Sequence, residues 1–114
     1  MKVVRAHGTP YERGAVIGEA FTDAMASSLA FNRRYLTGRG MGDDALERRL
    51  EPYLVAASAS LPHLVSQIRG MADGAERPFL DVFAANAFEE VYGVIELSAP
   101  SPAPLERCTD VVLC

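Results

Sequence analysis

The sequence lacks any long run of apolar residues. No stretch approaches the roughly 20 consecutive apolar residues that a membrane-spanning helix needs. The N-terminus has only two apolar residues between Lys2 and Arg5, so the apolar stretch of about 7–15 residues that marks a secretory signal is also missing. We therefore expect a cytoplasmic protein that has no membrane partner.

Basic residues are also few and scattered. Eleven Lys and Arg residues stand against fifteen Asp and Glu residues, the net charge is −4, and no basic run is longer than the pair Arg33-Arg34. A protein that binds a phosphate backbone carries clustered positive charge, so nucleic acid is not expected as a partner.

With 114 residues, 49% of them hydrophobic, the chain has the size and composition of one globular domain.

Only two cysteines are present, Cys108 and Cys114. Six positions along an extended strand span about 20 Å, whereas a disulfide needs Cα atoms within about 7 Å of each other. The two cysteines therefore cannot pair if their segment is a strand. Two cysteines without clustered histidines make no zinc site, so we expect no metal, and each cysteine must be explained by packing or by chemistry.

Apolar spacing and breaker residues predict a mainly helical chain. Thr9, Pro10 and Glu12 combine the hydroxyl, the proline and the carboxylate of a helix start. Apolar residues then recur at three- and four-residue intervals until glycines end the pattern. The expected elements are a short strand over residues 2–7 and helices over residues 10–37, 44–57, 62–74 and 79–92, with Pro52 kinking or dividing the second helix.

Gly14 and Gly18 lie four residues apart inside the first of these helices. They do not form a dinucleotide-binding fingerprint, whose glycines occupy a turn between a strand and a helix. Glycines at this spacing suit a close approach of a neighbouring helix.

The C-terminal part of the chain has a different composition. Residues 98–104 read Ser-Ala-Pro-Ser-Pro-Ala-Pro, in which the prolines remove backbone donors and favour extended chain. The β-branched residues that follow predict a strand. We expect three parts: residues 1–97 with one strand and about four helices, a linker at 98–107, and the start of a sheet at 108–114. One strand after a linker is an incomplete sheet, so we also expect a truncated chain.

Cys108 lies where the expected linker meets the expected strand. It is either a small apolar core residue or a nucleophile, because a thiol is strongly nucleophilic once a base activates it. His7 and His63 are remote in sequence, and we expect them to be structural or surface residues. Cleavage of the bond before Cys108 would supply a different base, because the freed α-amino group has a pKa of about 8 and can accept the thiol proton of the same residue.

Three stretches carry a resemblance to a known family: Gly8-Thr9-Pro10-Tyr11-Glu12-Arg13-Gly14 followed by Gly18, Ile68-Arg69-Gly70-Met71-Ala72-Asp73-Gly74-Ala75-Glu76-Arg77, and Cys108-Thr109. In this order and spacing they resemble the N-terminal part of the acyl-coenzyme A:6-aminopenicillanic acid acyltransferase family. Its members are self-processing cysteine amidases and acyltransferases with the N-terminal-nucleophile fold. The resemblance spans almost the whole chain.

The resemblance implies that the precursor cleaves itself at the Arg107-Cys108 bond. Cys108 then becomes the nucleophile, and its α-amino group becomes the base. Asn86 and Glu90 fall where the family places polar residues of the helix before the nucleophile. Phe88 replaces an arginine expected in this helix, and Arg107 replaces a frequent glycine.

Thr109 and Asp110 directly follow the expected nucleophile and are candidate supporting residues. On a strand, Asp110 shares a face with Cys108. A carboxylate there would raise the thiol pKa, so a buried Asp110 needs a hydrogen-bond partner from elsewhere.

The expected fold class is α+β: the mainly helical α-subunit region and the first catalytic strand of an αββα N-terminal-nucleophile hydrolase. The expected function is amide hydrolysis or acyl transfer through a thioester on Cys108, with this fragment inactive alone because the oxyanion donors lie downstream. No cofactor is implied. A small amide or an acyl-CoA donor is the expected substrate, and the C-terminal β-subunit part of the same protein is the expected partner. The alternative is a helical interaction or dimerisation module in which Cys108 is a buried thiol.

Overall fold

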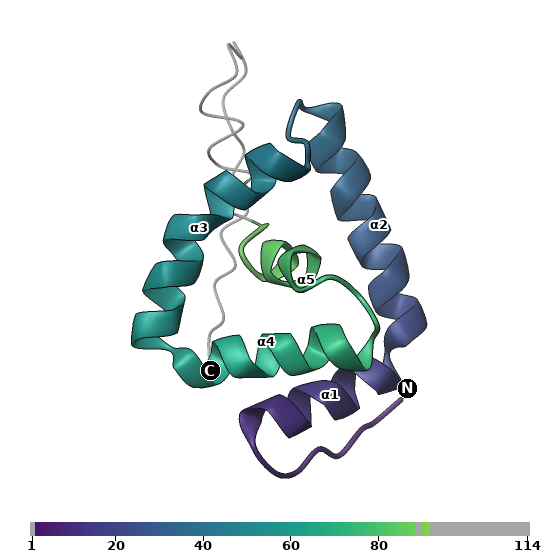
Figure 1. Cartoon of the computed structure of the whole chain (residues 1–114). Coiled ribbons are helices and arrows are strands. Elements are labelled where there is room, and N and C mark those ends of the chain that lie inside the picture. The colour runs from purple at the N-terminus through teal and green to yellow at the C-terminus, as the bar shows by residue number, and fades with distance from the viewer. Residues whose placement is uncertain (1, 89, 92–114) are drawn as a thin grey trace, which may run out of the picture.

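The computed structural model describes residues 2–88, 90 and 91, which form five helices joined by short loops (Figure 1). In chain order the helices are α1 (Pro10–Ala20), α2 (Thr22–Gly38), α3 (Asp43–Ser60), α4 (Pro62–Gly74) and α5 (Phe79–Asn86). In Figure 1, α2, α3 and α4 form the sides of a triangle, with α5 in its centre. The remaining helix, α1, packs along the outer side of α4.

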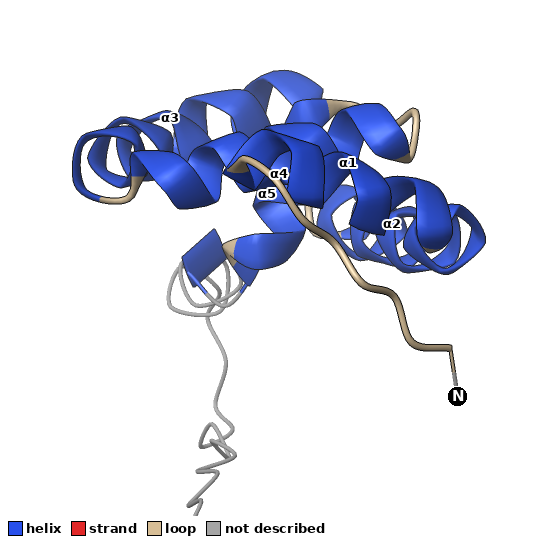
Figure 2. Cartoon of the chain, turned by 90° about the horizontal axis from the view of Figure 1, so that it is seen from below, coloured by secondary structure: helices blue, strands red, loops and turns tan. Residues whose placement is uncertain are grey.

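The expected α+β fold class is wrong. Within the described residues every regular element is a helix and none is a strand, as Figure 2 shows, so this part of the chain is all-α. Residues 2–7, expected to form a strand, have no second strand within the described chain with which to form a ladder. The Lys2 ammonium group instead donates a hydrogen bond to the Ala20 carbonyl and lies 5.2 Å from the centre of the Phe21 ring. The expected linker and the strand at 108–114 lie outside the described residues.

The single helix expected over residues 10–37 is two helices that meet at Phe21. The Phe21 backbone leaves the helical range (φ −116°, ψ 27°), although its N–H still donates to the Ile17 carbonyl at 3.1 Å. The next residue, Thr22, places its hydroxyl 3.0 Å and 2.9 Å from the carbonyl oxygens of Gly18 and Glu19. Such back-bonding by threonine bends helices. The change of direction allows α1 to follow α4 while α2 forms a different side of the triangle.

The other helix boundaries follow the sequence pattern more closely. Helix α4 has the expected bounds, Pro62–Gly74. Helix α3 begins one residue early and continues past Pro52 to Ser60, so proline does not divide it. Helix α5 begins at Phe79 as expected and ends at Asn86, earlier than expected.

The contact between α1 and α4 is made backbone to backbone. A Cβ atom added at Gly14 or Gly18 would lie 2.0 Å or 2.1 Å from a backbone carbonyl oxygen of α4. One added at Gly70 or Gly74 would lie 2.0 Å or 2.1 Å from a carbonyl oxygen of α1. Four glycines, two on each helix at a four-residue spacing, therefore form this crossing, and the close approach expected at Gly14 and Gly18 is confirmed.

Large side chains fill the triangle between the other helices. Leu50 of α3 is fully buried (0% exposed) in the same group as Phe83 of α5, and Val82 of α5 is buried in a second group. Two groups of buried side chains make up this core, namely Leu36, Met41, Leu46, Leu50, Phe83, Ala84 and Val91, and Leu29, Ala72 and Val82. Helix α5 contributes to both groups, which explains why it occupies the middle of the fold.

Candidate functional site

Most of the expected catalytic residues lie outside the described residues. These are the cleavage point Arg107-Cys108 and the supporting candidates Thr109 and Asp110. Of the expected site residues, the structure describes Asn86 and Glu90.

Asn86 and Glu90 do not form a cluster. Asn86 is the last residue of α5, and its side-chain amide donates to the Val82 carbonyl of the same helix at 2.8 Å. Glu90 is exposed, and within the described residues no hydrogen bond or ion pair joins it to Asn86. His7 and His63 are also exposed. None of these side chains is placed to act as a base for another.

Asn86 lies at the edge of an apolar groove between α2, α4 and α5. The groove has a volume of about 290 Å³ and is lined by Phe21, Ala24, Met25, Ser28, Leu29, Met71, Val82, Ala85 and Asn86. Met25 and Leu29 lie one helical turn apart on α2, and Met71 lies on α4.

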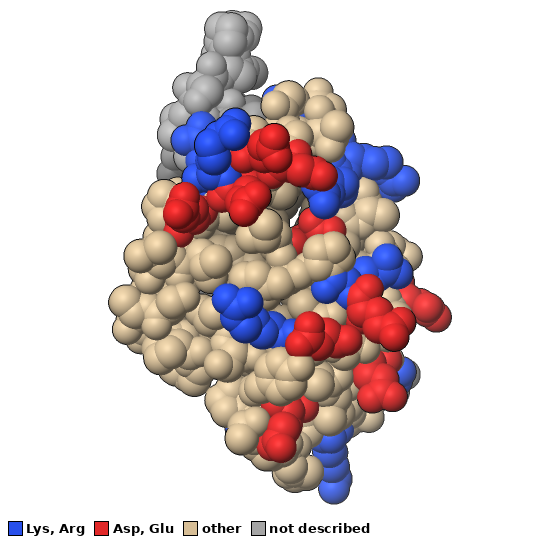
Figure 3. All heavy atoms as spheres, viewed as in Figure 1, with Lys and Arg blue, Asp and Glu red and all other residues tan. Residues whose placement is uncertain are grey.

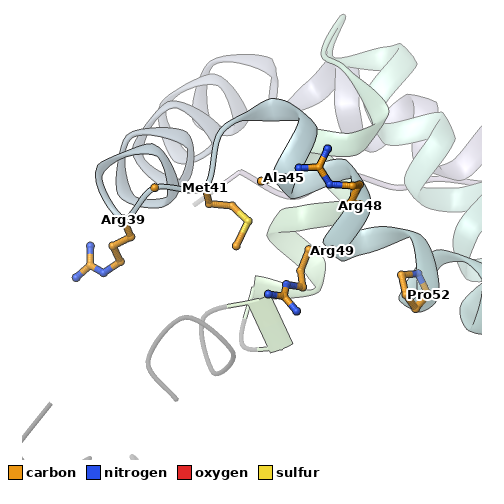
Figure 4. Close-up of a pocket in the computed structure, with 7 residues that line it drawn as sticks. Arg39, Met41, Ala45, Arg48, Arg49 and Pro52 are labelled. Carbon is orange, nitrogen blue, oxygen red and sulfur yellow. The ribbon is translucent and has the colours of Figure 1, made fainter. Parts of the chain in front are cut away.

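A larger pocket, of about 430 Å³, lies between the end of α2 and the N-terminal half of α3 (Figure 4). Its lining residues are Arg39, Gly40, Met41, Ala45, Arg48, Arg49 and Pro52. In Figure 4 the Met41 side chain lies between Arg39 on one side and Arg48 and Arg49 on the other. We call this the arginine pocket. Of the described residues that line it, three bear a guanidinium group and none bears a carboxylate.

The arginines of this region differ in how their charge is balanced. Arg33 of α2 forms an ion pair with Asp43 at the start of α3 and another, at 2.8 Å, with Asp81 of α5. Arg39 lies over the Tyr35 ring, with 3.6 Å between the guanidinium carbon and the ring centre. In contrast, no ion pair joins Arg48 or Arg49 to a carboxylate of the described chain.

Tyr11 and Asp73 form a polar contact at the edge of the α1–α4 crossing. The Tyr11 hydroxyl donates a hydrogen bond to the Asp73 carboxylate. This hydrogen bond raises the pKa of Tyr11 above its ordinary value, and slight desolvation and the negative charge of Asp73 act in the same direction. The contact adds a hydrogen bond between α1 and α4. Because it is exposed, it does not create a buried acid or base.

Two general features of the described chain concern metal binding and membrane spans. No three His, Cys, Asp or Glu side chains are grouped there so that they could hold a metal ion. None of the described helices combines the length and the hydropathy of a membrane span. In comparisons with known proteins, no protein-family model and no curated protein matches this chain.

The sequence reasoning missed the arginine pocket. Arg48 and Arg49 are adjacent in the sequence and offered a visible signal, but a basic pair on a helix is usually a solvated face. The turn after α2 brings Arg39 and Met41 opposite them, with Gly40 in the left-handed region at φ 81°. That turn depends on three backbone hydrogen bonds to the last turn of α2, which residue spacing alone does not reveal.

Proposed function

We propose that this chain is the helical N-terminal part of a cytoplasmic, self-processing cysteine amidohydrolase or acyltransferase whose nucleophile is Cys108. One observation supports the proposal above all. Two of the three stretches that carry the family resemblance, residues 8–18 and 68–77, pack directly against each other.

This contact depends on the residues that define the two stretches. Gly14 and Gly18 belong to the first stretch and Gly70 and Gly74 to the second, and each is required for the close approach of α1 and α4. Tyr11 and Asp73, which are 62 residues apart, add a hydrogen bond between the same stretches. Two unrelated chance similarities would not have to meet in space. Both stretches therefore belong to one packed unit, which supports their interpretation as parts of one motif.

The chemistry begins with self-cleavage. The Cys108 thiol attacks the carbonyl carbon of Arg107, and the C–N bond breaks as the acyl group moves to sulfur. The thiol proton passes to the Cys108 nitrogen, which becomes a free amine. Water then hydrolyses the thioester, which releases the Arg107 carboxylate and restores the thiol. The new α-amino group can take the thiol proton in later turnovers.

Turnover of a substrate repeats this acyl transfer. The thiolate attacks the carbonyl of a small amide or of an acyl-CoA, and an acyl-enzyme thioester forms as the amine or the CoA thiol leaves. Attack by water completes a hydrolysis, and attack by an amine completes an acyl transfer. In this proposal the remaining part of the same protein supplies the donors that stabilise the oxyanion.

The test compares Cys108→Ala with Cys114→Ala in the intact protein. Intact mass spectrometry of the unmodified protein should give one chain ending at Arg107 and one beginning at Cys108. Cys108→Ala should remain uncut and inactive, whereas Cys114→Ala should retain both cleavage and amide turnover. An uncut protein that still turns over amides would remove the α-amino base from the mechanism, and equal losses in both variants would contradict the role of Cys108.

A second candidate function is a helical interaction module, and one surface favours it. Val55, Leu61 and Leu64, at the junction of α3 and α4, are 64%, 45% and 44% exposed. The corresponding corner in Figure 3 carries few charged side chains. If this surface binds a second copy, Val55→Glu should convert a dimer to a monomer in light scattering, and Cys108→Ala should change nothing.

A further inference from the structure

The arginine pocket is a candidate ligand site, independently of the proposed function. We propose that it binds the phosphate group of a small phosphate ester, with Arg48 and Arg49 holding the phosphate and Met41 contacting the apolar part of the ligand. Its volume of about 430 Å³ falls within the range of small-molecule sites, about 300–1,000 Å³.

Charge is the first argument for this ligand class. Arg48 and Arg49 are consecutive residues of α3 that both line the pocket. Neither forms an ion pair within the described chain, whereas Arg33 nearby is matched by two carboxylates. Asp44 lies one helical turn before Arg48 and Glu51 one turn after it, but neither lines the pocket. Among the described residues that line the pocket, an anion would therefore meet guanidinium groups and no carboxylate.

The type of cation is the second argument. Arginine presents a planar set of donors that matches the oxygens of a phosphate in pairs, and it is less strongly hydrated than lysine. Both residues lie on a regular helix of 18 residues, so their Cα positions are fixed relative to each other. The site therefore favours a dianionic phosphate over a monocarboxylate.

The apolar lining is the third argument, and it extends the ligand beyond inorganic phosphate. Met41 is 9% exposed and belongs to the core, so its position is set by packing with Leu36 and Leu46. Ala45 and Pro52 add apolar surface on the α3 side. A compact apolar group esterified to the phosphate would cover this surface, and its burial would add to affinity.

The test is a titration of the full chain with phenyl phosphate, followed by amide chemical shifts in NMR spectra. We expect saturable shifts centred on Gly40, Met41 and Ala45, tighter binding than for inorganic phosphate, and no binding of phenol. The double variant Arg48→Gln/Arg49→Gln should weaken phenyl phosphate binding by about tenfold or more.

A charge-matched control separates a local site from the net charge of the protein. Arg5→Gln/Arg34→Gln removes two exposed positive charges elsewhere and should change the affinity less than about twofold. Arg48→Lys/Arg49→Lys keeps the charge but loses the planar donors, and it should give an intermediate affinity. Because both arginines are exposed, the variants should retain the wild-type circular dichroism spectrum and melting temperature. Equal weakening by the two Gln pairs, shifts centred elsewhere, or no saturable binding would overturn the proposal.

Discussion

The α1–α4 crossing and the α5-centred core of the triangle are held together in opposite ways. At the crossing, glycines remove side chains so that two backbones can touch. In the core, leucine, valine and phenylalanine side chains from α2, α3 and α5 fill the space between helices that stay further apart. The first arrangement has no room for an additional methyl group, and the second is weakened when methyl groups are removed. The same kind of substitution should therefore act differently in the two regions.

The largest expected effect is a truncation in the core. Leu50→Ala leaves a cavity at a fully buried position, and it should lower the free energy of unfolding by about 3 kcal/mol. Urea denaturation followed by circular dichroism measures this change. Leu50→Met conserves volume and should cost less than about 1.5 kcal/mol. Equal losses for both variants would mean that packing at Leu50 is not what stabilises this region.

The next effect is an enlargement at the crossing. Gly18→Ala places a methyl group against the Met71 carbonyl, so the helices must separate, at a cost of about 2–3 kcal/mol. Gly38→Ala is the matched control, because nothing lies within 4 Å of its Cβ position at the end of α2. It should stabilise the protein by about 0.5–1 kcal/mol through helix propensity. A Gly18→Ala variant as stable as Gly38→Ala would contradict the close crossing.

The smallest effect concerns the polar contact at the edge of the crossing. Because its pKa in the folded chain is raised above the ordinary value of 10.0, Tyr11 contributes stability that is fully present below about pH 10. This contribution is lost as the pH rises through the folded-state pKa. The difference in unfolding free energy between the wild type and Tyr11→Phe should therefore be constant below about pH 10 and shrink as the pH rises above it.

An independent measurement tests the cause of this pH dependence. In Asp73→Asn the carboxylate acceptor and its charge are gone, so an ultraviolet titration of tyrosine should show the Tyr11 pKa falling toward its ordinary value. An unchanged titration curve would show that Asp73 does not perturb Tyr11.

Helix starts were readable from the sequence because their signals are local. Thr9 and Glu12 form the expected capping box, with 2.7 Å between the Thr9 nitrogen and the Glu12 carboxylate, and Pro62 opens α4 as expected. The prediction of a strand over residues 2–7 was wrong because a strand needs a neighbouring strand to pair with, and a local sequence pattern does not reveal one. The break at Phe21 was missed because no glycine or proline marks it.

The candidate sites were less predictable than the helices. Asn86 was selected from a resemblance, and its contact with the apolar groove results from how α2, α4 and α5 pack. The arginine pocket combines α3 residues with the turn after α2, and these are opposite each other only after the chain reverses at Gly40. Sites assembled from several elements need the tertiary structure, whereas a helix cap needs only four consecutive residues.

The crossing of α1 with α4 also has a consequence for the order in which the chain folds. Tyr11 and Asp73 are 62 residues apart, so their contact closes a long loop. The entropy of loop closure is lost before the contacts between α1 and α4 can stabilise the fold. A ribosome synthesises α1 before α2 and α3, and the helix on which α1 packs follows only after these two. We therefore expect α1 to be made well before α4, and to be among the last of the five described helices to be packed.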